Sequence, residues 1–243
     1  MEAVRIDRLA MRGRPEGAAI MHQNWDNLLF LHWPIDAGAI RHLIPQALEL
    51  DTFDGVAWIG LTPFALNHLR LIALPEVPGL GSFLEVNVRT YVHYQGRPGI
   101  WFFSLDASKL IPTIAARIAF MLPYFKAEMT INERDGEFQF ASRRSGPPSA
   151  EMRTHWRTGI RLRAPDPDSL AFFLVERYCL FAGSNENLRT TRVYHAPWIL
   201  EEAHIRSHQS TMIASLGLPE PSAGPLSHFS RSMHVEIWPP AAV

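Results

Sequence analysis

The sequence predicts a mainly β protein of the α+β class, folded as a curled or closed antiparallel β-barrel with a few covering helices. Three observations predict this class. Polar residues occupy every second position from Glu85 to Tyr91, so they would share one face of a β-strand. Residues 100–103 are all apolar, which is typical of a strand buried on both faces. The chain also holds 19 prolines, which oppose long helices and suit strand ends and loops.

Apolar runs bounded by turn residues give the expected strands, and longer apolar stretches behind a capping residue give the expected helices. Strands are expected over residues 28–33, 56–64, 85–94, 100–106, 124–131, 137–142, 152–163, 188–194 and 233–238. Helices are expected over residues 37–44, 109–121, 166–178 and 210–216. The order lacks the regular strand–helix alternation of a parallel sheet, which favours antiparallel pairing.

Proline, glycine and aspartate mark the element ends in the first part of the chain. Pro34 ends the first strand, and Asp36 can accept a hydrogen bond from the first turn of the helix that follows. Asp54 and Gly55 form a tight-turn signal before the second strand. The five residues 95–99 are expected to connect the third and fourth strands as a hairpin.

The same signals continue beyond this hairpin and in the long stretch before it. Residues 66–81 contain several prolines and glycines and are expected to form an irregular loop, which could serve as a lid. Pro112 falls in the first turn of the second helix, where proline is tolerated. Residues 132–136 connect the strands on either side, and Asp168 or Ser169 caps the third helix.

Composition bounds the class of protein. With 19% charged and 47% hydrophobic residues, the 243-residue chain is expected to be a folded globule. We expect an N-terminal arm over residues 1–20 and a single domain over residues 21–243. The formal net charge of -1 gives no field that attracts nucleic acid or an anionic membrane. A single cysteine, Cys179, excludes an internal disulfide and fits a reducing compartment.

Localisation and partners follow from the hydropathy pattern. No apolar run approaches the roughly 20 residues that span a bilayer. Residues 1–14 lack the apolar core of a signal peptide. We therefore expect a cytoplasmic protein with a small-molecule ligand and with no nucleic-acid or membrane partner. Strand edges and aromatic patches also leave room for a homo-oligomer.

Common catalytic and metal-binding motifs are absent from the sequence. Residues 79–81 lack the third glycine of a dinucleotide-binding loop, and no Gly-x-Ser-x-Gly elbow occurs. Cys179 is expected to be a buried, unreactive thiol. His204 and His208 would share one face of a helix, but no carboxylate motif accompanies them. The sequence therefore predicts neither a metal nor a cofactor.

The main candidate site lies on the third expected strand. Its four alternating polar residues, here called the polar row, are Glu85, Asn87, Arg89 and Tyr91. A carboxylate on an inward face is costly unless it has a partner. Arg89 lies about 13 Å from Glu85 along the backbone, so Asp106, Arg192 or a ligand is an alternative partner. Two interpretations stay open: the row lines a cavity, or it forms a buried ion pair or a solvated outer face.

Several segments resemble known families. Residues 35–51 resemble the segment "TD-x-x-AL-x-x-x-VP-x-x-LE-x-D" of acetoacetate decarboxylase, and residues 79–85 are similar to the segment that carries its active-site glutamate. Over nearly the whole chain the sequence is similar to the YqjF-like (DUF2071) family. The motifs that carry this similarity are residues 28–34, 85–91, 101–106, 122–124, 176–178 and 236–240. The resemblance implies a cone-shaped, acetoacetate decarboxylase-like β-barrel with an internal pocket.

The resemblance does not carry over the decarboxylase chemistry. That family activates a lysine in a Pro-Lys-Lys segment for Schiff-base formation. Here the matching segment is Pro123-Tyr124-Phe125-Lys126, and the position of the family's active-site arginine falls near Asp26. Of the matched catalytic positions only Glu85 remains. The resemblance therefore implies the fold and argues against the decarboxylase reaction.

The leading functional hypothesis is a protein that binds a small anionic or carbonyl-containing molecule inside the barrel, with the question whether it also transforms that molecule left open. The candidate catalytic residues are Glu85, Asp106 and Tyr124. The candidate ligand-binding residues are Asn87, Arg89, Tyr91, Trp101 and Ser104, with Ser104 and Asp106 expected to face the polar row. One alternative is a lysine-dependent decarboxylase or aldolase that uses Lys126 or Lys109. Another is a non-catalytic structural or assembly protein, so the sequence leaves open whether the protein is an enzyme.

Overall fold

The computed structural model describes residues 6–72, 81–109 and 120–243, and these residues are mostly strand. The strands are β1 (Met21–Ile35), β2 (Glu49–Leu50), β3 (Ala57–Leu71), β4 (Phe83–Tyr94), β5 (Arg97–Ala107), β6 (Tyr124–Arg134), β7 (Glu137–Arg144), β8 (Glu151–Arg161), β9 (Cys179–Gly183), β10 (Leu188–Tyr194), β11 (Glu201–Ser210), β12 (Leu226–Ile237) and β13 (Ala241–Ala242). The helices in this part of the chain are α1 (Ala37–Arg41), α3 (Leu170–Val175) and the short 3-10 helix η1 (Ala214–Leu216).

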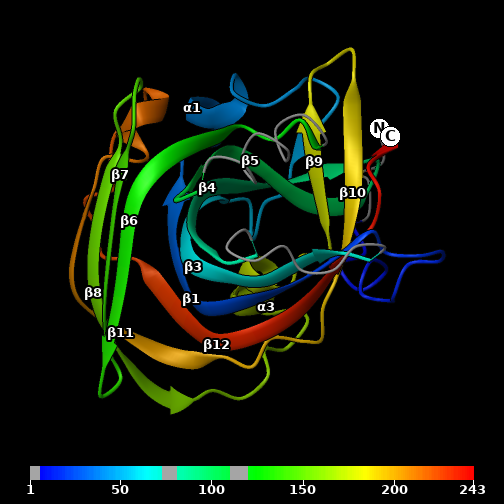
Figure 1. The fold of residues 1–243 in the computed structure, drawn as a ribbon. Helices are drawn as coiled ribbons and strands as arrows, with labels where there is room; N and C mark the ends of the chain where they lie inside the picture. Colours follow the sequence, from blue (N-terminus) through cyan, green and yellow to red (C-terminus); the bar gives the residue numbers. More distant parts are fainter. Residues whose placement is uncertain (1–5, 73–80, 110–119) are drawn as a thin grey trace.

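All 13 described strands belong to one sheet, which closes on itself twice. Strands β12, β1, β3, β4 and β5 are neighbours in that order, and we call them the central wall. Strands β6, β7, β8 and β11 complete the wall into a closed ring of 9 strands, the large ring. Strands β9 and β10 complete the same wall into a second, smaller ring, the small ring. Figure 1 shows β6–β8 on one side of the wall and β9 and β10 on the other.

Each ring closes because the two outer strands of the central wall have split edges. The edge of β5 pairs with β9 at Ile100 and Trp101, and with β6 from Leu105 to Ala107. The edge of β12 pairs with β10 at Glu236 and Ile237, and with β11 near its other end. Successive parts of one strand therefore join different rings. The predicted barrel is confirmed. The division of the β5 and β12 edges between two rings was not predicted, because no local sequence pattern indicated it.

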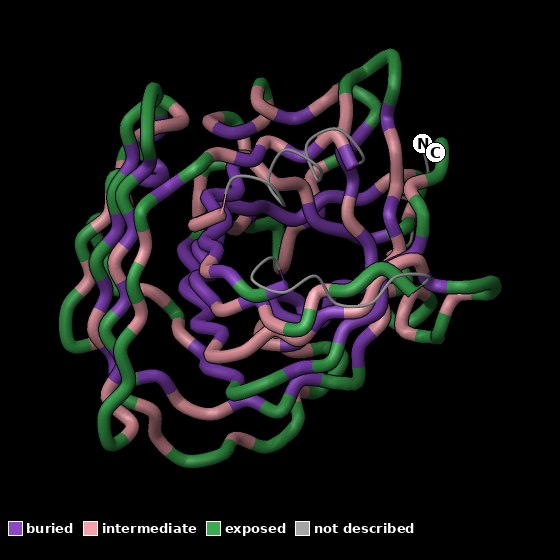
Figure 2. Tube along the Cα trace, in the orientation of Figure 1, coloured by how far each residue is buried: buried purple, intermediate pink, exposed green. Residues whose placement is uncertain are grey.

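The large ring is filled by apolar side chains. Val86 and Val88 of β4 belong to the same buried cluster as Phe138, Trp156 and Phe229 from the strands around the ring. Phe138 stacks on Trp156 with ring centroids 5.0 Å apart. The opposite face of β4 turns toward the small ring, so this strand is buried on both faces, and Figure 2 shows the wall as mostly buried. Strand β4 thus separates two interiors, with its apolar face toward the large ring and its polar face toward the small ring.

Tight turns account for the regular hairpins. The residues between β4 and β5 are Gln95 and Gly96, with φ angles of 50° and 78°. Asp135 and Gly136 between β6 and β7 have φ angles of 53° and 78°. Two successive residues with positive φ form the turn whose twist matches a two-residue hairpin. The expected five-residue connection 95–99 is therefore shorter than predicted.

Several expected boundaries need correction. Strand β1 continues through Pro34 to Ile35. The pairing of β1 with β12 stops at His32, so this side of β1 is unpaired at Pro34, and the missing N–H of proline breaks no hydrogen bond between strands. The expected loop 66–81 begins too early, since β3 continues to Leu71. The other part of that loop, residues 73–80, lies outside the described residues, as does most of the expected helix 109–121.

Strands β2, β9, β11 and β13 were missed, and α1, α3 and η1 are shorter than the helices expected there. Strand β11 is mostly half-buried or exposed, and its charged residues hide the alternation that marks a strand. His204 and His208 therefore lie on a strand instead of a helix. The third expected helix ends at Val175, which frees the apolar residues that follow to form β9. The helix expected over 210–216 is reduced to η1.

Helix caps and the N-terminal arm are the remaining local features. Asp36 accepts a hydrogen bond from the backbone of Ala39, and Ser169 accepts one from Phe172, so both helix starts are capped by predicted residues. The described part of the arm contacts the domain through two ion pairs, which join Arg8 to Asp51 and Arg14 to Glu236.

Candidate ligand site in the small ring

Two adjoining cavities occupy the interior of the small ring. The outer chamber has a volume of about 370 Å³ and a mostly apolar lining. The inner recess has a volume of about 70 Å³ and is lined in part by Asn87, Arg89 and Thr62. Both cavities are lined by Trp25, Glu85, Phe102, Leu180 and Val193, so they share a wall or a passage at these residues.

Glu85 lies where the two cavities meet. It is 3% exposed, and its Oε2 accepts a 2.9 Å hydrogen bond from the hydroxyl of Tyr124. Burial raises the pKa of Glu85 to about 7, and the hydrogen bonds from Tyr124 and Asn87 partly oppose this increase. Burial and the neighbouring carboxylate of Glu85 raise the pKa of Tyr124 well above its usual value. The pair therefore consists of a carboxyl group that titrates near neutral pH and a neutral phenol.

The geometry of this pair follows from strand register. Leu105 pairs with Asn87 of β4 on one side and with Tyr124 at the start of β6 on the other. Paired residues share a face of the sheet, so Tyr124 lies on the same face as the polar row. Because the edge of β5 pairs with β6 at this point, Tyr124 at the start of β6 lies next to Glu85.

Arg89 is the second feature of the site. It is 7% exposed, and its Nε and Nη2 atoms have no hydrogen-bond partner among the described residues. The guanidinium carbon lies 5.3 Å from the centre of the Phe30 ring. A buried cation is normally paired with an anion or fully hydrogen-bonded, because leaving water is costly for it. The structure therefore presents a cation with unused donors beside the recess.

Other polar groups around Arg89 also lack protein partners. The Oδ1 of Asn87, the Oγ1 of Thr62 and both ring nitrogens of His32 are buried without a hydrogen bond within the described part of the chain. The register across the wall brings them together, because Gly60 pairs with both His32 and Arg89. A Cβ atom at Gly60 would lie 2.9 Å from the His32 ring, so glycine makes room for the imidazole. Burial and Arg89 hold the pKa of His32 well below its usual value.

Asp106 and Ser104 do not face the polar row, which corrects that expectation. In β5 they pair with Val86 and Val88, so they lie on the opposite face of the wall. Asp106 forms a bidentate ion pair with Arg144, with bonds of 2.8 and 2.7 Å, and both side chains are buried. Asp106 is thus held by an arginine on the large-ring side and does not line either cavity.

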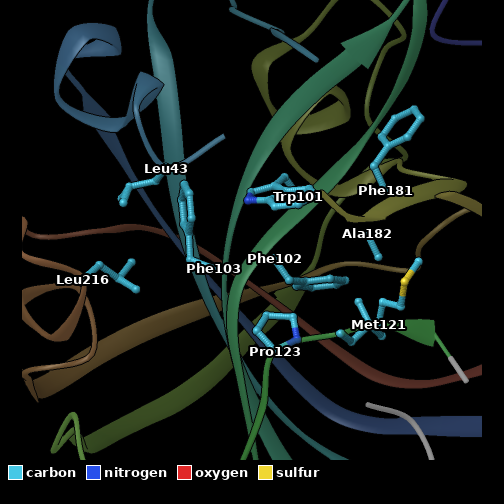
Figure 3. Close-up of a pocket in the computed structure, with 11 residues that line it drawn as sticks. Leu43, Trp101, Phe102, Phe103, Met121, Pro123, Phe181, Ala182 and Leu216 are labelled. Carbon is cyan, nitrogen blue, oxygen red and sulfur yellow. The ribbon is translucent and has the colours of Figure 1, made fainter. Parts of the chain in front are cut away.

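Trp101 and Tyr91 also lie outside the two cavities. Trp101 lines a separate cleft of about 250 Å³ beside Phe103, Pro123 and Phe181, where the edge of β5 splits (Figure 3). Tyr91 lies on the polar-row face, and its hydroxyl donates a 2.8 Å hydrogen bond to the carbonyl of Leu174.

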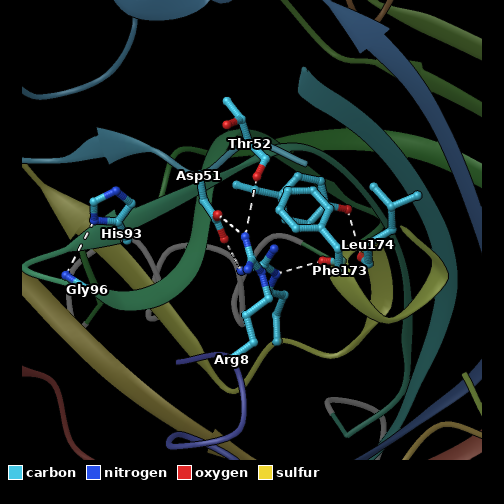
Figure 4. Close-up of polar contacts among 9 residues, drawn as sticks. Arg8, Asp51, Thr52, His93, Gly96, Phe173 and Leu174 are labelled. Atoms are coloured by element: carbon cyan, nitrogen blue, oxygen red, sulfur yellow. Dashed lines mark hydrogen bonds and ion pairs between the residues drawn. The ribbon is translucent and has the colours of Figure 1, made fainter. Parts of the chain in front are cut away.

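Behind Tyr91 lies an ion-pair network that joins the arm to α3. Asp51 accepts hydrogen bonds from Arg177, at 2.7 Å, and from Arg8 (Figure 4). Arg177 also donates to the carbonyl of Phe173 at 2.9 Å. These contacts satisfy Asp51 and fix α3 against the end of β4.

The side chains that would support alternative chemistry are two lysines and one thiol. Lys126 is exposed, and Lys109 is half-buried; neither lines a cavity. Cys179 lines the recess, but burial raises the pKa of its thiol, so the less reactive protonated form is favoured.

One group of described residues has the composition of a metal site. Side-chain ligand atoms of His22, His234 and Glu236 lie within 4.8 Å of one another on the outside of β1 and β12. Glu236 is already paired with Arg14. No helix among the described residues has both the length and the apolar character needed to cross a membrane.

Sequence reasoning missed several residues that line the recess. They are Trp25, Thr62, Phe102, Arg177, His195 and Trp198. They come from different strands and loops, and only closure of the small ring places them together. An isolated tryptophan or histidine in a sequence carries no signal for such a role.

Comparisons with known proteins place the chain among relatives of similar length. The model of the DUF2071 family, described as "Uncharacterized conserved protein", matches residues 22–234. The protein YqjF of Bacillus subtilis (strain 168), also described as uncharacterized, is 39% identical over 225 residues, which cover 93% of each chain.

Solved structures show the same fold at low sequence identity. The enduracididine biosynthesis enzyme MppR in complex with pyruvate has a TM-score of 0.65 at 14% identity, over 96% of this chain and 91% of that chain. An acetoacetate decarboxylase-like enzyme from Sphingomonas wittichii RW1 has a TM-score of 0.62 at 12% identity, over 93% and 94%. Acetoacetate decarboxylase from Legionella pneumophila has a TM-score of 0.59 at 14% identity, over 100% and 98%. The fold is therefore acetoacetate decarboxylase-like.

Proposed function

The chain belongs to the DUF2071 family, and we propose that it binds a small organic anion in the small ring, with Glu85 and Tyr124 as an acid–base pair beside it. The observation that carries this proposal is Arg89. It is a buried arginine, beside a cavity, whose Nε and Nη2 donors have no partner among the described residues. Arginine donors match the geometry of a carboxylate, which can accept two parallel hydrogen bonds.

Other groups in the recess suit the same ligand. Asn87 and Thr62 have side-chain oxygens without partners, which can accept hydrogen bonds from a hydroxyl on the bound molecule. The ring nitrogens of neutral His32, which interacts with Arg89 but does not line the recess, also lack partners among the described residues. The neighbour MppR is described in complex with pyruvate, a carboxylate with an adjacent carbonyl, so a 2-oxo acid is a reasonable first probe.

Glu85 and Tyr124 supply the means for proton transfer. A general base works best when its pKa is close to the operating pH, and that of Glu85 is about 7. Ionised Glu85 can take a proton from a carbon or oxygen of the ligand. Protonation of Glu85 weakens its hold on the phenol O–H, which can then donate its hydrogen bond to the developing oxyanion. The reaction class that fits these groups is proton abstraction next to a carbonyl.

The test compares pyruvate binding to the wild-type protein and to Arg89→Met by calorimetric titration. Charge-assisted hydrogen bonds contribute about 1.5–3 kcal/mol, so binding should weaken roughly 10- to 100-fold. Arg97→Met, a change at an exposed arginine on the neighbouring strand, should bind as the wild type does. Equal binding by all three proteins would rule out Arg89 as the anion site.

The lysine-dependent alternative makes a different prediction. A Schiff base between pyruvate and a lysine is trapped by borohydride as a stable mass increase. Because Lys126 is exposed and neither Lys126 nor Lys109 lines the cavities, we expect no adduct. A stoichiometric adduct on either lysine would favour the hypothesis of a lysine-dependent decarboxylase or aldolase.

A further inference from the structure

The outer chamber indicates the class of ligand. We infer that the bound molecule is a monocarboxylic acid with an apolar body of several carbon atoms, which enters carboxylate first and leaves its apolar part in the outer chamber. This inference rests on the proposed anion site at Arg89. It adds a second recognition element, which an anion site alone does not require.

The order of residues along β4 sets the direction in which the ligand lies. Phe83 lines only the outer chamber, Glu85 lines both cavities, and Asn87 and Arg89 line only the recess. A strand advances about 3.3 Å per residue, so Arg89 lies about 20 Å beyond Phe83 at the backbone. Leu71, at the end of β3, also lines the chamber and is 42% exposed, which places the opening at that end.

The chamber lining is apolar almost throughout. Its aliphatic and aromatic members are Ile20, Met21, Trp25, Leu66, Leu69, Leu71, Phe83, Phe102, Leu105, Phe120, Leu122, Leu180, Val193 and Ile237. Its polar members are Gln23, Glu85, Tyr124 and Thr191, and Glu85 and Tyr124 are hydrogen-bonded to each other. A chain of methylene groups would lie mostly against apolar side chains there.

The same lining disfavours other anions. Among the residues that the structure describes, no lysine or arginine lines the outer chamber, so they offer no cation to the second carboxylate of a dicarboxylic acid. A sugar acid would lose the hydration of several hydroxyl groups to an apolar surface, which is costly. The recess holds Arg89, which has unused donors, and Arg177, which is paired with Asp51, while the outer chamber is apolar. This combination selects one charge and one apolar body.

The experiment measures the affinity of straight-chain alkanoates from acetate to decanoate by calorimetry at about pH 6, where most Glu85 is protonated and does not repel the carboxylate. Each added methylene should tighten binding by up to about fourfold until the chamber is full. We expect octanoate to bind at least tenfold more tightly than butanoate. Succinate and octanol should both bind much more weakly than octanoate.

Two matched variants test whether the apolar part of the ligand lies in the outer chamber. Leu69→Asn places an amide in the chamber and should weaken octanoate at least fivefold while leaving acetate unchanged. Leu226→Asn changes a 39% exposed leucine outside both cavities and should alter neither. Thermal unfolding of both variants confirms that they fold.

The outcomes separate the two proposals. If acetate and octanoate bind equally and Arg89→Met weakens both, the anion site stands and the apolar-body inference is overturned. If octanol binds as tightly as octanoate and Arg89→Met has no effect, the chamber binds apolar molecules and the anion site is wrong. If Leu69→Asn weakens acetate and octanoate alike, the apolar part does not lie in the outer chamber.

Discussion

Glu85 and Asp106 are buried carboxyl groups on opposite faces of the same wall, and their surroundings differ in one decisive respect. Asp106, in the filled large ring, is held by two hydrogen bonds from Arg144. Glu85, in the hollow small ring, has a neutral phenol as its hydrogen-bond donor and a cavity on either side. A buried charge with a complementary partner is typical of structural roles, whereas an incompletely neutralised group beside a cavity is a candidate for chemistry.

Arg144 and Arg89 differ in whether their hydrogen-bond donors have partners. Arg144 uses its Nε and Nη2 donors on Asp106, while the corresponding donors of Arg89 have no partner among the described residues. Burial alone therefore does not identify the site. The unpaired donors of a buried arginine beside a cavity do, and the following experiments test that distinction from the largest expected effect to the smallest.

The largest effect is expected for Arg144→Ala, which leaves Asp106 buried without its cation. Breaking a buried ion pair on one side costs about 3–5 kcal/mol of unfolding free energy. Urea denaturation measures the loss. Arg143→Ala is the control, because Arg143 is adjacent, exposed and paired with exposed Glu128, so a much smaller loss is expected. Similar losses for the two variants would contradict a structural role for the Asp106 pair.

The pH dependence of stability should isolate Glu85. Its pKa is raised from 4.5 to about 7 in the folded protein, so the folded state binds more protons between these values than the unfolded state does. The stabilising contribution is complete below about pH 4.5 and is lost as pH rises through 7. The total change is about 3 kcal/mol.

Glu85→Gln removes this titration. Denaturation of the wild type and the variant across this range should give a difference in unfolding free energy that falls toward higher pH and levels off above 7. A constant difference would show that the pKa of Glu85 is not raised.

A matched pair of valine truncations compares the two interiors. Val88→Ala removes methyl groups from the packed core of the large ring and should cost about 2 kcal/mol. Val193 lines both cavities of the small ring, so Val193→Ala removes fewer contacts and should cost about 1 kcal/mol or less. The measurement is again urea denaturation. Equal costs would indicate that the small ring is as tightly filled as the large one.

The smallest effect is expected for Tyr124→Phe. Loss of the phenol hydroxyl removes a donor from Glu85, which should cost about 1 kcal/mol at neutral pH. Because that hydrogen bond lowers the pKa of Glu85, the midpoint of the pH dependence should move upward. Tyr194→Phe, a change at a half-buried tyrosine that lines neither cavity, should leave the midpoint in place. An unchanged midpoint in Tyr124→Phe would show that the contact with Glu85 is absent in solution.

Local sequence patterns were sufficient for most strands and for part of the site. The alternation in residues 85–91 predicted β4 and the common face of Glu85, Asn87 and Arg89, because successive side chains of a strand point to opposite sides. Asp36 and Ser169 cap the helices as predicted. The polar strand β11 was missed because its surroundings, which the sequence does not describe locally, determine its pairing.

Only the tertiary structure decided which side chains share an interior. The pairing of β4 with β5 contains a register shift near Val88 and Arg89, and pairing rather than sequence spacing puts Asp106 opposite Val86. One-residue changes of register exchange the two faces of a strand. The expectation that Asp106 faces the polar row therefore depended on a register that the sequence alone does not specify.

The sequence by itself thus determined the β-rich class, the two-faced character of β4 and the placement of a carboxylate and a cation on one of its faces. These properties follow from the order of polar and apolar residues that are adjacent in the sequence, because strand geometry points successive side chains to opposite faces. Closure of two rings on one wall decided that Glu85 faces Tyr124 and a cavity while Asp106 faces Arg144. That outcome depends on pairing between strands distant in sequence, and the free energy that selects it comes from the packing of the whole sheet.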